Sequence, residues 1–216
     1  MIVRMWMTPK VISVAPNTPI GQAAALMAEH GIRRLPVVEP AAHGHGRLVG
    51  ILSQGDVLHA APAVVNPFSG SGPGALPADV LVAHVMHSPV VTTHPDAPIE
   101  QVAELMRTLK IGSLPVVEHD HVVGVVTESD IFRAFASLFA VAGELTRITF
   151  EVALGEEVFG LVSDIAKRHG LQIHGLMSSM IEGRPVFVLW VAGTGIERLQ
   201  QELWSGGHVV LSVLRV

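Results

Sequence analysis

The chain contains no cysteine among its 216 residues. This absence excludes disulfide bonds, thiolate metal sites and a cysteine nucleophile, and it fits a reducing cytoplasm. Charged residues are also scarce, at 15% of the chain, and the formal net charge is −5. Because a broad nucleic-acid surface needs clustered Lys and Arg, the composition argues against nucleic-acid binding. Apolar residues make up 49% of the chain, which excludes an intrinsically disordered protein.

Long hydrophobic runs are missing too. The most apolar stretch, residues 134–143, is bounded by Arg133 and Glu144, and it falls well short of the roughly 18 residues that a membrane-spanning helix needs. The first nine residues show neither the continuous apolar stretch nor the small-residue cleavage site of a signal peptide. We therefore expect a soluble, cytoplasmic protein without a membrane partner.

The common catalytic signatures are absent as well. The sequence has no Gly-x-Ser-x-Gly, no phosphate loop with Gly-Lys-Ser/Thr and no His-Glu-x-x-His. The glycine-rich stretch 70–74 follows no expected strand and opens no clear helix, so we interpret it as part of a linker. Without a nucleophile or an acid–base set, the chain is expected not to be an enzyme and to have no catalytic residues.

What the chain does contain is a repeat. Residues 50–56 are Gly-Ile-Leu-Ser-Gln-Gly-Asp, and residues 124–130 are Gly-Val-Val-Thr-Glu-Ser-Asp. The same five residues, Leu-Pro-Val-Val-Glu, precede each copy, at 35–39 and at 114–118. Two such coincidences in the same order indicate a duplicated structural unit.

Each copy predicts a strand, a helix, two paired strands and a closing helix. The strands expected in the two copies are residues 11–14, 35–38 and 48–53, then 90–93, 114–117 and 122–127. The copies give two domains, residues 1–61 and 83–143. Residues 62–82 form the connection, and its first part, to Pro77, has the Pro, Gly and Ser content of a linker.

After Gly143 the repeat ends and a different pattern begins. Its elements are a strand at 147–153, a helix at 156–169, a hairpin of 171–181 with 185–191, a helix at 194–203 and a strand at 209–216. The order β-α-β-β-α-β predicts a ferredoxin-like arrangement, in which two helices cover one face of an antiparallel sheet. The expected fold class is therefore α+β, with a third domain at residues 145–216.

The two repeated units resemble CBS domains, named after cystathionine β-synthase. The matching marks are a Met-x-Pro or Met-x-x-Pro start, the Leu-Pro-Val-Val strand, and Gly followed by two apolar residues, Ser or Thr, two variable residues and Asp. The resemblance covers roughly the first two-thirds of the chain. It implies a compact pair, the Bateman module, whose clefts bind an adenine nucleotide as a regulatory ligand. AMP, ADP, ATP and S-adenosylmethionine all fit that description, and no cofactor is required.

The last third is similar to an ACT domain, a ferredoxin-like fold that often binds amino acids at subunit interfaces. A CBS pair followed by an ACT-like domain is the arrangement of proteins of the acetoin-utilisation protein B type, and both parts imply a homodimer. The usual ACT ligand loop carries Asp or Asn followed by Pro-Gly. The corresponding residues here, 153–160, contain no Pro-Gly. The sequence therefore leaves the ligand of this domain unassigned.

Two carboxylates are the leading candidates for ligand binding. Asp56 and Asp130 each follow a hydroxyl residue, Ser53 and Thr127, by three positions at the expected start of a helix. Such a pair forms a capping box, which stabilises the helix. A carboxylate there can equally accept two hydrogen bonds from the vicinal hydroxyls of a ribose, the role that the CBS resemblance implies. The two roles are compatible.

Basic residues precede the first Leu-Pro-Val-Val strand. Arg33 and Arg34 occupy positions where CBS domains often carry basic residues that contact the phosphates of a ligand. Two adjacent guanidinium groups suit a di- or triphosphate. A solvated pair at a helix end is the alternative. The second copy has Gly112 and Ser113 at these positions. The sequence therefore predicts unequal clefts, the first being better suited to phosphate-rich ligands.

The twelve histidines of the chain do not predict a metal site. His43 with His45, and His119 with His121, lie in equivalent turns, but two ligands fall short of the three or four that zinc needs. Two functions remain after these exclusions. One is a regulatory sensor of an adenosine-containing nucleotide that acts on an unknown protein. The other is a structural or partner-binding dimer with unoccupied clefts.

Overall fold

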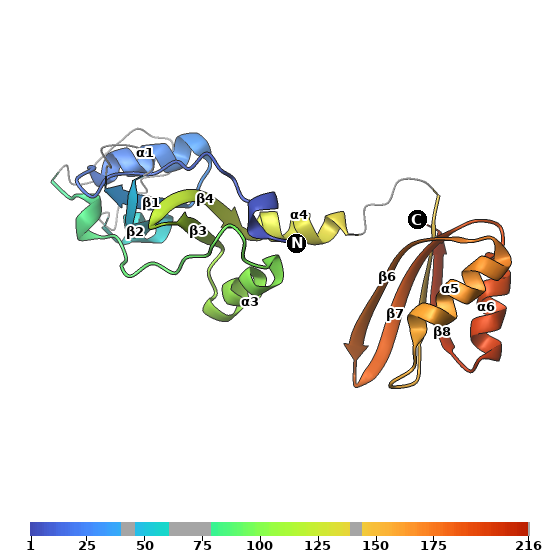
Figure 1. The fold of residues 1–216 in the computed structure, drawn as a ribbon. Helices are drawn as coiled ribbons and strands as arrows, with labels where there is room; N and C mark the ends of the chain where they lie inside the picture. The colour runs from blue at the N-terminus through green and yellow to red at the C-terminus, as the bar shows by residue number, and fades with distance from the viewer. Residues whose placement is uncertain (40–45, 61–78, 139–143, 216) are drawn as a thin grey trace. The chain divides into compact units, whose positions relative to one another are not determined.

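The structure is a computed structural model, and it describes residues 1–39, 46–60, 79–138 and 144–215. The chain divides into two compact units, residues 1–138 and 139–216 (Figure 1). The glycine-rich stretch 70–74, most of the expected linker, and the His43–His45 pair lie outside the described residues. No helix in the described ranges is long and apolar enough to cross a membrane.

The first unit is built from the two repeats around one sheet. Its helices and strands are α1 (Ile20–His30), β1 (Arg34–Glu39), β2 (Arg47–Ser53), α2 (Gln54–Ala60), α3 (Ile99–Leu109), β3 (Ser113–Glu118), β4 (His121–Thr127) and α4 (Glu128–Ser137). The sheet order is β1-β2-β4-β3, and β2 meets β4 through one residue pair, Arg47 and His121. Each repeat therefore contributes an antiparallel hairpin to a common sheet.

The strands expected at 11–14 and 90–93 do not form. Only one residue of each segment, Val14 and Thr93, makes a bridge to the sheet. A proline follows two residues later in each case, Pro16 and Pro95. Because proline has no N–H to donate, the ladder of backbone hydrogen bonds stops after one residue.

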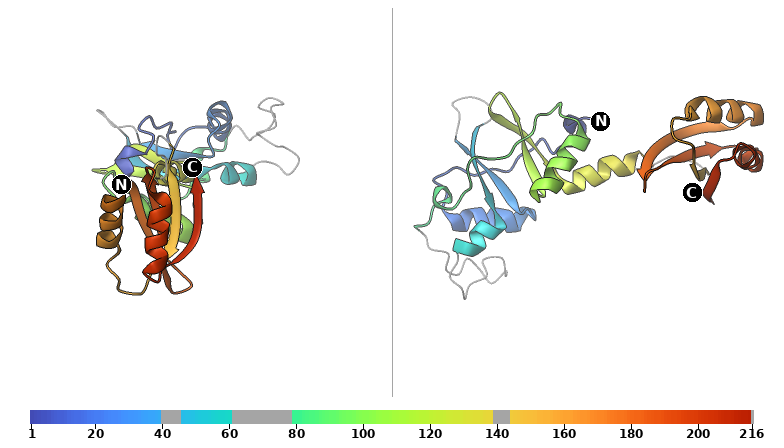
Figure 2. Two further views of the ribbon diagram at one scale, coloured as in Figure 1. Left: turned by 90° about the vertical axis from the view of Figure 1, so that its right-hand side faces the viewer. Right: turned by 90° about the horizontal axis from the view of Figure 1, so that it is seen from below.

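The two repeats exchange segments. The N-terminal segment, residues 1–8, contains a 3₁₀ turn, η1 (Val3–Met5), and fully buries Val3 in the core of the second repeat. Residues 79–87 contain the turn η2 (Val82–His84) and bury Val82 in the core of the first repeat. The residues at 79–82 were expected in the linker, but Val80 also packs against that core. Figure 2 shows the N-terminus next to α3 and α4.

Close packing of these segments accounts for the first glycine of each repeated motif. A Cβ atom built on Gly50 would lie 2.5 Å from the sulfur of Met86, and one on Gly124 would lie 2.6 Å from the sulfur of Met7. Both distances are shorter than any real contact, so a side chain at either position would force the methionine of the exchanged segment to move.

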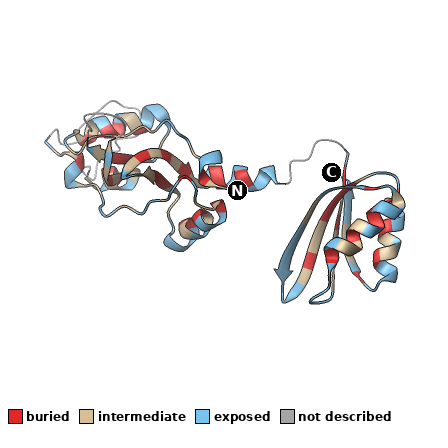
Figure 3. Ribbon diagram, in the orientation of Figure 1, coloured by how far each residue is buried: buried red, intermediate tan, exposed pale blue. Residues whose placement is uncertain are grey.

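The second unit has the element order β-α-β-β-α-β. Its elements are β5 (Thr146–Glu151), α5 (Val158–His169), β6 (Gln172–Ile181), β7 (Arg184–Ala192), α6 (Ile196–Ser205) and β8 (Val209–Arg215). All strand pairs are antiparallel, in the order β6-β7-β5-β8. Both helices pack against the same core as β5 and β7, and buried residues line the helix faces that meet this sheet (Figure 3). This is the topology of a split βαβ fold.

Candidate functional site

The two candidate carboxylates occupy equivalent places in the repeats. Asp56 lies in the first turn of α2, where its Oδ2 atom accepts hydrogen bonds from the backbone N–H and the hydroxyl of Ser53, both at 2.7 Å. In the second repeat, Oδ2 of Asp130 accepts from the N–H and hydroxyl of Thr127 at 2.9 and 2.8 Å. The capping interpretation is therefore correct at both sites, and it uses one oxygen of each carboxylate.

The second oxygen of each carboxylate meets a different neighbour. Oδ1 of Asp56 lies 3.3 Å from Nδ1 of His87, which comes from the exchanged segment 79–87. Oδ1 of Asp130 lies 2.8 Å from a guanidinium nitrogen of Arg133, one turn along the same helix. Neither neighbour is predicted from the sequence. The spacing of three between Asp130 and Arg133 is a readable helical ion-pair signal. His87 gives no such signal, because only tertiary packing brings it to Asp56.

Arg33 and Arg34 line a cavity of about 400 Å³ that both repeats build. The other lining residues are Gly31, Ile32, Gly112, Ser113, Val125, Thr127, Glu128 and Ser129. Within the described ranges neither arginine forms an ion pair. A Cβ on Gly112 would lie 3.3 Å from a guanidinium nitrogen of Arg34, so this arginine of the first repeat rests against the second.

Residues that were expected to line two separate clefts line this one cavity. The sequence assigned the arginines to the first cleft and Gly112 with Ser113 to a poorer second one. The structure brings all four residues together with Thr127 in one cavity, opposite the first turn of α4. That turn carries the partial positive charge of a helix N-terminus, and two guanidinium groups add to it. Glu128 contributes one negative charge at the rim. The cavity can hold an anion such as a phosphate.

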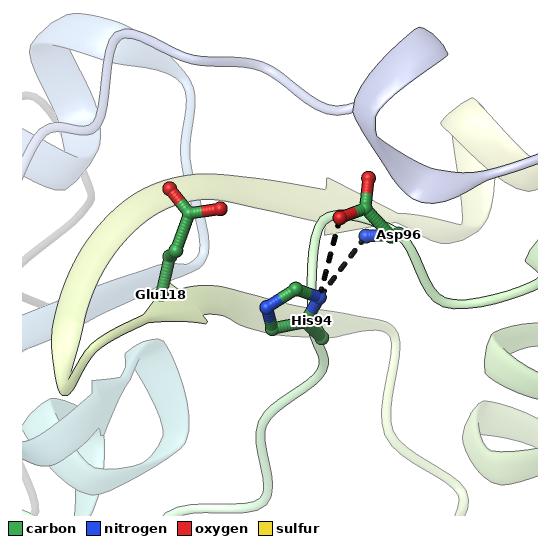
Figure 4. A group of neighbouring side chains, drawn as sticks. All are labelled: His94, Asp96 and Glu118. Atoms are coloured by element: carbon green, nitrogen blue, oxygen red, sulfur yellow. Dashed lines mark hydrogen bonds and ion pairs between the residues drawn. The ribbon is translucent and has the colours of Figure 1, made fainter.

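A group of possible metal ligands lies elsewhere in the first unit. His94, Asp96 and Glu118 bring donor atoms within 4.8 Å of one another (Figure 4). The guanidinium of Arg4 is bound to both carboxylates, at 3.2 Å from Asp96 and 3.1 Å from Glu118. Its hydrogen bond to Asp96 holds the pKa of that carboxyl below its usual range. The guanidinium of Arg4 thus supplies the positive charge that these carboxylates would otherwise offer to a cation. The same contacts connect the N-terminal segment to the second repeat.

In the second unit, the loop between β5 and α5 is held by a buried histidine. The ring of His208 bridges the carbonyl of Leu203 through Nδ1, at 2.9 Å, and the carboxylate of Glu156 through Nε2, at 2.7 Å. The hydrogen bond with His208 is the main reason why the pKa of Glu156 lies below its ordinary value of 4.5. The loop is therefore fastened to the end of α6.

This fastening predicts a pH-dependent difference in stability. A carboxyl whose pKa is lowered by folding stabilises the protein above its ordinary pKa, and the contribution is lost as the pH falls through the folded pKa. We expect Glu156→Gln to be less stable than the wild type at pH 7 in urea unfolding. The gap should narrow as the pH falls below about 4.5. Glu182→Gln, at an exposed hairpin turn, is the control. A gap independent of pH would contradict the expectation.

The first unit of the chain is similar to known proteins. The family model for the CBS domain matches residues 3–63 and 82–137. The CBS domain-containing protein YhcV of Bacillus subtilis is 30% identical over 145 residues, which are 67% of this chain and 93% of YhcV. The L-aspartate semialdehyde sulfurtransferase of Methanocaldococcus jannaschii is 32% identical over 125 residues, 57% of this chain. Since the match spans 21% of that enzyme, most of the enzyme lies outside it.

Two solved structures resemble the chain at 30% identity. One is a protein from Vibrio cholerae described as an acetoin utilization protein (AcuB), with a TM-score of 0.51 over 64% of this chain and 93% of that chain. The other is the CBS domain pair of protein MJ0100 in complex with 5′-methylthioadenosine and S-adenosyl-L-methionine. Its TM-score is 0.50, over 63% of this chain and 97% of that chain.

Proposed function

Because this chain belongs to the CBS domain family, we propose that it is a non-catalytic regulatory protein that senses an adenosine-containing nucleotide. AMP, ADP, ATP and S-adenosylmethionine are the ligands of this class. The CBS pair of MJ0100, 30% identical to this chain, is described in complex with two adenosine-containing molecules, which supports the class of ligand. Binding would change the packing of the two repeats, or the contact with a regulated protein, by favouring one arrangement over another.

One observation carries the proposal. Arg33 and Arg34 have no ionic partner in the described part of the chain, and they line a cavity of about 400 Å³ together with the N-terminal turn of α4. Such a volume lies within the usual range for small-molecule sites. Unpaired guanidinium groups beside a helix N-terminus are suited to phosphate or carboxylate.

Each candidate residue has a role in this proposal. Asp56 and Asp130 accept hydrogen bonds from the ribose hydroxyls, while Ser53 and Thr127 hold these carboxylates in place. The arginines bind the phosphates or the charged tail of the ligand. Gly112 and Ser113 line the cavity beside the arginines, and the missing side chain of Gly112 lets Arg34 come close to the second repeat.

The proposal extends to the rest of the chain. The domain limits are 1–61, 83–143 and 145–216, and the third domain is ACT-like, which the sheet order β6-β7-β5-β8 supports. Its role is to pass the signal to a protein partner from within a homodimer in the cytoplasm. Light scattering measures the oligomeric state, and cell fractionation tests the location.

A second candidate function is a structural or partner-binding dimer whose clefts stay empty. The contacts of Asp56 with His87 and of Asp130 with Arg133 favour it, because they cover the oxygens that a ribose would use. The two functions differ in one cheap measurement, the response of the folded protein to nucleotides.

We expect at least one of AMP, ADP, ATP and S-adenosylmethionine to raise the thermal stability of the wild type. A ligand at 100 times its Kd adds about 2.7 kcal/mol to the free energy of unfolding. Arg33→Ala should weaken the binding of ATP about tenfold, since a hydrogen bond to a charged group contributes about 1.5 kcal/mol or more. Lys10→Ala removes an exposed cation outside the cavity and serves as the control. If no nucleotide stabilises the wild type, the partner-binding dimer is the better function.

A further inference from the structure

Asp130 keeps only one acceptor position for a ligand. Thr127 fills Oδ2 with its N–H and its hydroxyl, and Arg133 takes one of the two positions on Oδ1 at 2.8 Å. The side chain of Asp130 is only 8% exposed. The two hydroxyls of a ribose need acceptor positions on the carboxylate. Arg133 must therefore leave before this carboxylate can accept hydrogen bonds from both ribose hydroxyls.

The same guanidinium also holds the N-terminal segment. Its nitrogen donates to the backbone carbonyl of Trp6 at 2.9 Å, and its central carbon lies 5.9 Å from the centre of the Trp6 ring. A cation at that distance from an indole face is attracted to it. One side chain, 62% exposed, thus joins the candidate ribose carboxylate to a segment 127 residues away in the sequence.

Trp6 is held in a position that leaves its own donor unsatisfied. The Nε1 atom of Trp6 is buried and has no hydrogen-bond partner among the described residues. A buried donor without an acceptor destabilises the state that contains it. The contact with Arg133 offsets this cost, so loss of that contact favours movement of Trp6.

The first repeat joins its carboxylate to its exchanged segment without a guanidinium group. The position equivalent to Arg133 is His59, an exposed residue on α2. Asp56 instead faces His87, whose side chain is 72% exposed and 3.3 Å away. His87 belongs to the exchanged segment 79–87, so this looser contact joins carboxylate and segment directly. A guanidinium that bridges the two is therefore particular to the second repeat.

We propose that Arg133 is a latch, which occupies the Asp130 carboxylate in the absence of ligand and releases Trp6 when a ribose displaces it. The proposal rests on the proposed function, because it requires a nucleotide to enter the cleft. In this proposal the N-terminal segment is the first part of the protein to move when a ligand occupies this cleft. It also makes Arg133 an inhibitory residue for binding, although its charge would attract phosphate.

The test compares AMP with 2′-deoxy-AMP, which lacks one of the two ribose hydroxyls. Calorimetry measures the Kd of both for the wild type, Arg133→Gln and His59→Gln. Arg133→Gln should bind AMP about tenfold more tightly than the wild type, equivalent to about 1.4 kcal/mol. The matched variant His59→Gln should bind like the wild type. The deoxy compound should bind more weakly than AMP to each protein.

Fluorescence tests the second half of the latch. AMP should change the tryptophan emission of the wild type, and the change should be absent from Trp6→Phe, which keeps Trp190 and Trp204. If AMP binds but Arg133→Gln binds it equally or less tightly, the latch is wrong and the nucleotide function stands. If AMP binds but leaves the fluorescence emission of Trp6 unchanged, the latch is likewise wrong and the nucleotide function stands. If neither the wild type nor Arg133→Gln binds any adenosine compound, both proposals fail.

Discussion

Replacing Val3 by aspartate is expected to remove at least about 3 kcal/mol from the free energy of unfolding, since an unpaired charge would enter an apolar core. Val3 is fully buried among Ile99, Leu114 and Val126, although it lies almost at the start of the chain. Urea unfolding measures the loss. We also expect the variant to lose nucleotide binding, because residues 1–8 pack against the strand that leads to Thr127.

The control for this substitution lies two residues away. Met5 belongs to the same 3₁₀ turn but is 66% exposed, so Met5→Asp should change the free energy of unfolding by about 0.5 kcal/mol or less. Equal unfolding midpoints for Val3→Asp and Met5→Asp would show that the N-terminal segment is not part of the second core.

Phe150→Ala is expected to cost the second unit about 3–5 kcal/mol, the usual range for removing a buried phenylalanine. The ring is fully buried on β5, 6.0 Å from the ring of Phe187 and 6.4 Å from that of His208. The cavity left behind is bordered by strands and helices that are already tightly packed, so it cannot close fully. Unfolding followed by the emission of Trp190, a buried residue of β7, measures the effect.

Phe159→Ala is the matched substitution in the same unit. Phe159 lies at the start of α5 and is 67% exposed, so its loss should leave the unfolding transition within about 0.5 kcal/mol of the wild type. A loss of less than 1 kcal/mol in Phe150→Ala would contradict the position of this ring at the centre of the core.

The sequence by itself determined the repeat, the paired strands of each copy and the order of elements in the second unit. The repeat follows from comparing two stretches of the sequence, residues 50–56 with 124–130. The strands and helices follow from patterns within about ten residues, namely apolar periodicity and turn residues. Capping at Ser53 and Thr127 was predictable for the same reason, since a box of this kind needs residues only three positions apart. The strands at 11–14 and 90–93 were overpredicted, because apolar content cannot show whether a neighbouring strand continues the ladder.

Only the tertiary structure decided which repeat each segment completes. Val3 precedes the first repeat in the chain but packs in the core of the second. Val82 lies just before the second repeat but packs in the core of the first. The meeting of Arg34 with Gly112 and of His87 with Asp56 follows from that exchange. Local propensity carries no information on contacts between residues separated by 30 to 80 positions. Burial of apolar surface in the shared cores fixes them.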